Sequence, residues 1–320
     1  MPVSIDDNGV RRLTGEEIAP VELKRTGRLS AVSVLAAALL AGCGGSSPSS
    51  SGTLDALMKR PGPDVPVIAG AADFEPGVVR LPFLVRRDDA RPVDRPTARV
   101  WLATGRERKP FAQTTARLET IGVRGRWATT AVTRIYVAHL PIPRPGRYWL
   151  VAEPTGARIQ ANGAIDVAAH SSSPAVGARA PRSDTPTLAT SGSNIDRLTT
   201  RRPPDSALLR YSVAASLDAR RPFVLTFASS QFCASPTCAP VVDVVDAVRR
   251  RFASSGVRFI HVEVFRDNDP HRGYNRWMRQ WGLPSEPWTF LVGKDGRVKA
   301  KFEGAVSEAE LVSAVRKTLL

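Results

Sequence analysis

A short polar loop with two cysteines lies between an apolar run and a helix-forming segment, in residues 223–240 (FVLTFASSQFCASPTCAP). Residues 222–228 are mostly apolar or β-branched, which predicts a buried strand that begins at a proline. A helix over 240–252 is predicted by valines at helical spacing, and Pro240 is tolerated in the first turn of a helix. The chain is therefore expected to run from a buried strand through the cysteine loop into a helix.

The loop itself allows its two thiols to meet. Cys233 and Cys238 are separated by residues 234–237 (ASPT). A tight turn through these residues can bring the two Cα atoms to the roughly 4.4–6.8 Å that a disulfide requires. The stretch is expected to carry either a redox-active dithiol or a small structural disulfide.

The length and charge of the chain limit the number of domains and the kinds of partner that it can have. A chain of 320 residues with 42% hydrophobic residues has room for two globular domains and a leader. Its net charge is +15, but the arginines are scattered and form neither a basic helix nor a basic stripe with interleaved aromatic residues. We therefore expect no nucleic-acid partner, whereas an anionic lipid surface would suit this charge.

A leader precedes the globular part. The apolar run 29–41 is too short to span a bilayer and follows basic residues, as in a secretory signal. Residues 39–43 (LLAGC) resemble the bacterial lipobox, which implies removal of 1–42 as a signal peptide and lipidation of Cys43. Residues 43–68 begin with glycines and serines and are expected to form a flexible tether. The folded part is then expected on the extracytoplasmic face of the cell membrane, where disulfides are chemically permitted.

Short alternating apolar runs fill residues 69–170. Turn residues such as Pro145-Gly146 separate them, and no helical periodicity appears. This pattern predicts an antiparallel β-sandwich of the immunoglobulin-like type, which we interpret as a spacer or a partner-docking module. His139 falls in or beside a strand and is expected to be an ordinary strand residue and not a ligand.

Residues 171–205 are rich in Ser, Pro, Thr and Arg and are expected to be a linker. Helical and strand periodicities alternate after it. Asp295-Gly296 predicts a hairpin turn, and Ser307 with Glu310 predicts a capping box at the start of the last helix. We expect helices over 206–217, 240–252, 273–281 and 307–320, and strands over 222–228, 257–265, 288–293 and 297–303.

This order of strands and helices is similar to the thioredoxin fold over about 176–320. The most specific match is residues 281–292 (WGLPSEPWTFLV), which look like the cis-proline segment of that family. Residues 176–181 (VGARAP) look like an opening common among its extracytoplasmic members. The resemblance implies that the bond before Pro287 is cis and that Pro287 lies against the cysteine pair. We therefore expect a thioredoxin-like α/β domain over 206–320.

The chain departs from the thioredoxin pattern in three respects. Four residues separate the cysteines instead of two, and Pro240 suggests that the helix begins after Cys238. Such a start would give Cys233 less stabilisation of its thiolate from the helix N-terminus. The buried acid of the family is missing, because Thr226 stands near its place. Glu286, just before Pro287, is either a substitute proton acceptor near the thiols or a solvated loop carboxylate.

From the resemblance we expect a membrane-tethered thiol–disulfide oxidoreductase that needs no cofactor and no metal. Cys233 would attack a client disulfide, and Cys238 would resolve the mixed intermediate. The backbone beside Pro287 would pair with the client peptide as an added strand. The expected partners are protein thiols or disulfides of extracytoplasmic clients, an electron donor or acceptor in the membrane, and the bilayer through Cys43.

Two other functions remain open at this point. A copper chaperone of the Sco type would use both cysteines and a distal histidine, but His261 falls in a strand and His271 follows Asp269-Pro270. A scaffold lipoprotein would keep Cys233 and Cys238 only as a structural disulfide, although so short a loop gains modest stability from closure. A peroxiredoxin is less consistent with the sequence, because that family places a threonine three residues before its reactive cysteine.

Overall fold

The computed structural model describes residues 52–123, 132–232 and 238–320. The expected signal peptide and the expected lipid attachment at Cys43 lie outside these residues, as does Cys233. None of the helices within the described ranges combines the length and apolar character that a bilayer crossing requires.

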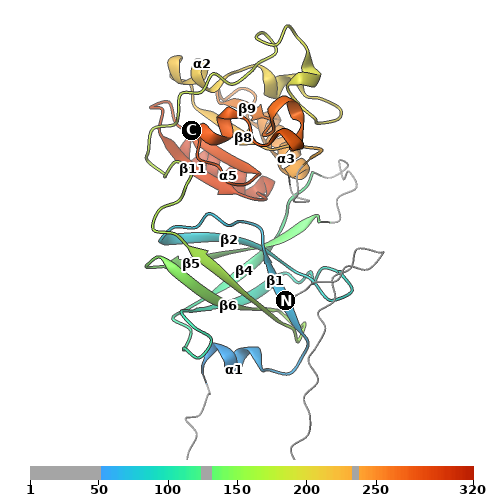
Figure 1. Ribbon diagram of the computed structural model, residues 1–320, viewed down its shortest axis with the longest axis vertical. Coiled ribbons are helices and arrows are strands. Elements are labelled where there is room, and N and C mark those ends of the chain that lie inside the picture. The colour runs from blue at the N-terminus through green and yellow to red at the C-terminus, as the bar shows by residue number, and fades with distance from the viewer. Residues whose placement is uncertain (1–51, 124–131, 233–237) are drawn as a thin grey trace, which may run out of the picture. The chain divides into compact units, whose positions relative to one another are not determined.

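The first half of the described chain forms a closed β-barrel (Figure 1). The order around the barrel is β1-β2-β5-β4-β3-β6-β7, and the parallel pair β1–β7 closes it, whereas the other neighbours are antiparallel. Its strands are β1 (Asp64–Ala69), β2 (Gly77–Val85), β3 (Thr97–Ala103), β4 (Ala112–Thr120), β5 (Arg134–Ile142), β6 (Gly146–Pro154) and β7 (Gln160–Val167).

The prediction of an immunoglobulin-like sandwich is therefore wrong. Alternating strands with one buried face occur both in two packed sheets and in a barrel, so the periodicity does not distinguish the two architectures. Closure depends on the pairing of Asp64 with Gln160, which are far apart in the sequence. The inward side chains of all the barrel strands form one core, which includes Leu81, Tyr136 and Leu150.

The described part of the segment that was expected to be a flexible tether, residues 52–68, contains a helix and most of β1. Helix α1 (Leu54–Met58) starts after Thr53, whose hydroxyl accepts a hydrogen bond from the amide of Ala56 at 3.2 Å. Leu54 is fully buried and packs with Trp101. Burial of Leu54 helps to hold this short helix against the barrel, and the amides of Leu54 and Asp55 also donate to the carbonyls of Arg108 and Arg106 at 2.9 and 2.8 Å.

The second half contains a four-stranded sheet, among the described residues, in the order β11-β10-β8-β9. Its strands are β8 (Phe223–Phe227), β9 (Arg258–Val262), β10 (Trp288–Val292) and β11 (Val298–Glu303). The pair β8–β9 is parallel, and the other two pairs are antiparallel. The helices are α2 (Val213–Asp218), α3 (Cys238–Arg251), α4 (Arg276–Gln280) and α5 (Glu308–Thr318). The alternation of strands and helices is the one that the sequence predicts, although α2 and α4 are shorter than expected.

Local signals explain most of these elements. The side chain of Ser307 accepts from the amide of Glu310, and the side chain of Glu310 accepts from the amide of Ser307, so the predicted capping box is confirmed. Gly296, at the hairpin turn between β10 and β11, has a φ of 73°. Helix α3 begins at Cys238, so the prediction that it begins after Cys238 is wrong. Pro240 still falls in the first turn, where amides have no partner within the helix.

Apolar side chains fill both faces of the sheet. Helices α3 and α5 pack on one face, where the valines of α3 meet Leu311 and Val315 of α5. Trp281, Trp288 and Phe290 form a cluster of aromatic rings on the other face.

The segment 171–205, expected to be a linker, packs closely against the α/β region. Arg179 forms a β-bridge with Arg297, and Ser183 is fully buried. The hydroxyl of Ser183 accepts from the indole N–H of Trp281 at 2.9 Å. The composition of this segment is typical of a linker, but its small polar side chains supply hydrogen bonds to buried groups.

Polar contacts connect the barrel with the α/β region. Arg80 of β2 donates from Nε and Nη2 to the two carboxylate oxygens of Glu310, at 2.7 and 2.9 Å. The carboxylate of Glu303 accepts from the amides of Ala72 and Asp73 at 2.9 and 2.7 Å. Bidentate pairs of arginine with carboxylate fix orientation as well as distance.

Candidate functional site

The candidate site lies where β8 ends and α3 begins. Cys238, the first residue of α3, is fully buried and takes part in a disulfide. It packs among the valines of its own helix. The other two cysteines of the chain, Cys43 and Cys233, lie outside the described residues, so the expected pair is placed only at its Cys238 end.

Pro287 lies beside the end of β8. The Glu286–Pro287 bond is cis, as the resemblance implies, and Pro287 is buried. The antiparallel register pairs Trp288 with Phe227, so Pro287 lies across from Ala228, the residue that follows β8. The structure thus brings together Pro287, Glu286 and the chain that leads into the cysteine loop.

Glu286 is half-buried and faces the same turn. Its Oε2 accepts a hydrogen bond from the amide of Ser229 at 2.7 Å. Burial raises the pKa of Glu286 to about 7; the hydrogen bond from Ser229 opposes this change, and the negative charge of Glu263 adds to it. A carboxyl group with such a pKa can both donate and accept a proton at neutral pH.

A second carboxylate, Glu263, follows β9 and is only 5% exposed. Its Oε1 accepts from the amide and the hydroxyl of Thr200, at 2.6 and 2.8 Å. Its Oε2 has no hydrogen-bond partner among the described residues. The hydroxyl of Thr200 also accepts from the amides of Ser230 and Gln231 at 3.1 and 3.2 Å.

Sequence reasoning missed both Glu263 and Thr200. A single acid within the apolar run 259–265 (FIHVEVF) is a signal that could have identified Glu263, because a buried charge needs partners. Thr200 gives no such signal, since it stands in a polar segment that resembles a linker.

The neighbouring strand positions carry no further acid. Thr226 of β8 is fully buried, and its hydroxyl lies 3.3 Å from that of Thr289 on β10. His261 of β9 is buried and donates from Nε2 to the carbonyl of Ala228 at 2.9 Å, whereas His271 is exposed. Within the described ranges, no three His, Cys, Asp or Glu side chains are grouped so that they could hold a metal ion.

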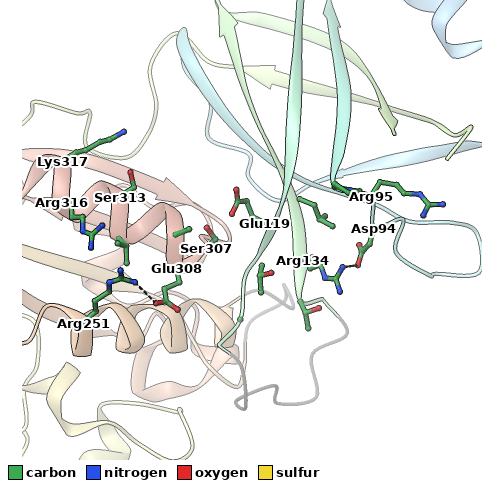
Figure 2. A pocket seen from close by; sticks show the side chains of 17 residues that line it. Asp94, Arg95, Glu119, Arg134, Arg251, Ser307, Glu308, Ser313, Arg316 and Lys317 are labelled. Atoms are coloured by element: carbon green, nitrogen blue, oxygen red, sulfur yellow. Dashed lines mark ion pairs between the residues drawn. The ribbon is translucent and has the colours of Figure 1, made fainter. Parts of the chain in front are cut away.

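A separate pocket lies between the ends of β4 and β5 and helix α5 (Figure 2). Charged side chains line it and form exposed pairs: Arg134 with Asp94 at 3.6 Å, and Arg251 with Glu308 at 3.9 Å. Glu263, Glu286 and Cys238 are not among its lining residues. This pocket therefore adds no group to the candidate site.

Comparisons with known proteins found partial likenesses among solved structures. No family model and no curated protein matches the chain. Part of the chain is similar to a solved structure described as a thiol:disulfide interchange protein of the thioredoxin family from Chlorobium tepidum TLS. The match has 18% sequence identity and a TM-score of 0.25, and it covers 33% of this chain and 85% of the other.

Proposed function

We propose that this chain is a thiol–disulfide oxidoreductase in which Cys233 and Cys238 exchange electrons with cysteine pairs of client proteins. The observation that carries the proposal is the position of Glu286. Its proton-exchanging carboxyl group lies next to the cis bond before Pro287 and is hydrogen-bonded to the turn that leads from β8 toward the cysteine loop. Such a group is useful beside thiols, which must lose and gain protons during exchange.

In this proposal the reduced protein carries both thiols. The thiolate of Cys233 attacks a client disulfide and forms a mixed disulfide, and the released client thiolate takes up a proton. The thiolate of Cys238 then attacks the sulfur of Cys233 and releases the second client thiol. The client gains two electrons and two protons, and the protein is left with a disulfide. Glu286 accepts and returns protons in these steps, and the reaction can run in either direction.

The proposal extends to the surroundings of the protein. The client peptide adds as a strand along the backbone beside Pro287. A lipid on Cys43 holds the protein on the extracytoplasmic face of the cell membrane. An electron donor or acceptor in the membrane then returns the cysteine pair to its starting redox state.

Variants of the full chain test the proposal with a model protein disulfide as substrate. Cys233→Ser should abolish turnover, because the attacking sulfur is lost, and Cys238→Ser should accumulate a mixed disulfide visible on a non-reducing gel. Cys43→Ser, measured in detergent, is the matched cysteine control and should turn over at the rate of the unaltered protein. Unchanged turnover in both Cys233→Ser and Cys238→Ser would refute the proposal.

One observation favours a second function. Cys238 is fully buried and disulfide-bonded within the core beneath α3, as in a structural disulfide. The chain would then be a scaffold or binding lipoprotein with a thioredoxin-like region that no longer turns over. A redox titration separates the two functions, because structural disulfides have potentials below about −300 mV.

A further inference from the structure

Thr200 is hydrogen-bonded to its full capacity at the turn after β8. A hydroxyl offers one donor and two acceptor positions. Thr200 donates to Oε1 of Glu263 at 2.8 Å and accepts from the amides of Ser230 and Gln231 at 3.1 and 3.2 Å. Its own amide also donates to Glu263, at 2.6 Å. A side chain from outside the sheet thus holds two consecutive amides of the turn.

The same turn is held at both of its ends. The amide of Ser229 donates to Glu286 at 2.7 Å, and the hydroxyl of Ser229 accepts from the amide of Phe232 at 3.2 Å. The four residues 229–232 therefore have every amide hydrogen-bonded to an oxygen of a side chain. Phe232 is the residue before Cys233, so this geometry sets how the chain enters the cysteine loop.

Glu263 is fixed at this place by more than Thr200. The side-chain amide of Asn275 donates to the backbone carbonyl of Glu263 at 2.5 Å. Oε2 of Glu263 is buried and has no hydrogen-bond partner among the described residues, an arrangement that costs folding free energy. A glutamine would hold Thr200 through its side-chain oxygen without a buried charge, which indicates that the charge itself has a use.

In addition to burial, the negative charge of Glu263 raises the pKa of Glu286. In addition to burial, the charge of Glu286 raises the pKa of Tyr274. These are the titratable groups that interact with Glu286 across the described part of the site. Glu286 precedes β10 and Glu263 follows β9, and these two strands lie on opposite sides of β8.

We propose that Thr200 and Glu263 are a positioning pair for the exchange reaction: Thr200 orients the turn that enters the cysteine loop, and Glu263 fixes Thr200 and keeps a negative charge behind Glu286. This inference rests on the proposed function. Both residues are buried, so Thr200 acts through the turn, and Glu263 acts through Thr200 and Glu286.

Thr200→Val tests the orienting role, with Thr200→Ser as the matched control that keeps the hydroxyl. We expect the valine variant to reduce a model protein disulfide about tenfold more slowly, because two amides lose their acceptor. The serine variant should remain within about twofold of the unaltered protein. Equal rates for the valine and serine variants would overturn the orienting role.

Glu263→Gln tests the charge, and Asp196→Asn is its control, because Asp196 is exposed and paired with Arg202 at 3.0 Å. We expect the midpoint of the pH–rate profile to move to lower pH in Glu263→Gln and to stay in place in Asp196→Asn. A carboxyl ¹³C titration of Glu286 should move in the same direction. An unchanged profile and titration in Glu263→Gln would overturn this part.

Hydrogen exchange separates failure of this inference from failure of the proposed function. In the oxidised full chain, Thr200→Val should increase exchange at the amides of Ser230 and Gln231, and Thr200→Ser should not, whether or not the protein turns over. The unaltered protein and both variants could all fail to turn over, while only Thr200→Val loses protection of these amides from exchange. That result would refute the proposed oxidoreductase function but support the orienting contact. Protection that persists in Thr200→Val would overturn the positioning pair.

Discussion

Replacement of Glu286 by glutamine should stabilise the protein, compared with the unaltered chain, and this gain should be larger at alkaline pH than at acid pH. Glu286 has a pKa of about 7 in the folded protein against its ordinary value of 4.5. The folded protein therefore holds this proton more tightly than the unfolded chain does. The stability that this proton confers is fully present below pH 4.5 and is lost as the pH rises to about 7. Above that pH there is no further loss.

The size of the effect follows from the two pKa values. One pKa unit corresponds to about 1.4 kcal/mol, so the interval from 4.5 to about 7 corresponds to at most about 3.5 kcal/mol. Because Glu286 is only half-buried, solvent screening reduces this to about 1–3 kcal/mol. Glutamine carries no charge and keeps an oxygen that can accept from the amide of Ser229.

Urea denaturation of the oxidised protein, followed by tryptophan fluorescence to which the buried Trp281 and Trp288 contribute, measures the unfolding free energy. The gain in unfolding free energy of Glu286→Gln over the unaltered protein should be larger at pH 8 than at pH 5 by about 1–3 kcal/mol. Glu107→Gln removes an exposed carboxylate of the barrel and should show no such difference. A difference within about 0.5 kcal/mol of zero, or of opposite sign, would refute the reasoning.

Three further substitutions test the fold, each by the shift of the urea midpoint. Tyr136→Phe should cost about 1–2 kcal/mol, because the buried hydroxyl donates at 2.7 Å and accepts at 2.8 Å within the barrel; an unchanged midpoint would mean that these bonds add nothing. Ser307→Ala should cost about 1 kcal/mol through loss of the capping box, and Ser307→Thr should restore most of it. Gly304→Ala should cost more than about 2 kcal/mol, because a Cβ would lie 2.0 Å from the carbonyl oxygen of Gly70. Gly156→Ala, with nearly the same φ but open space, should cost about 1 kcal/mol, and equal losses at both glycines would contradict the role of this close approach.

The α/β half could be predicted from the sequence because its signals are local. The Asp295-Gly296 turn and the Ser307 capping box each depend on residues a few positions apart. The barrel could not be predicted, because its closure depends on the pairing of β1 with β7 across the length of the unit. The start of α3 was predicted too late, since Pro240 marks a first turn without fixing which residue begins it.

Part of the candidate site could also be predicted from the sequence, and part could not. The cis bond before Pro287 was predicted, because Glu286 and Pro287 stand together in a distinctive segment that leads into β10. Thr200 was missed because its contacts with Glu263 join two segments that nothing in the sequence pairs. Cys43 and Cys233 remain sequence-based predictions, since both lie outside the described residues.

The two halves of β1 pair with different neighbours. Residues 64–66 pair with β7, and residues 67–69 pair with β2. If the chain before Asp64 is pulled, the force runs along this strand and loads the hydrogen bonds on both sides in shear, so that they must break together and not one by one. Force applied through the N-terminal segment would therefore meet its first resistance to unfolding at β1.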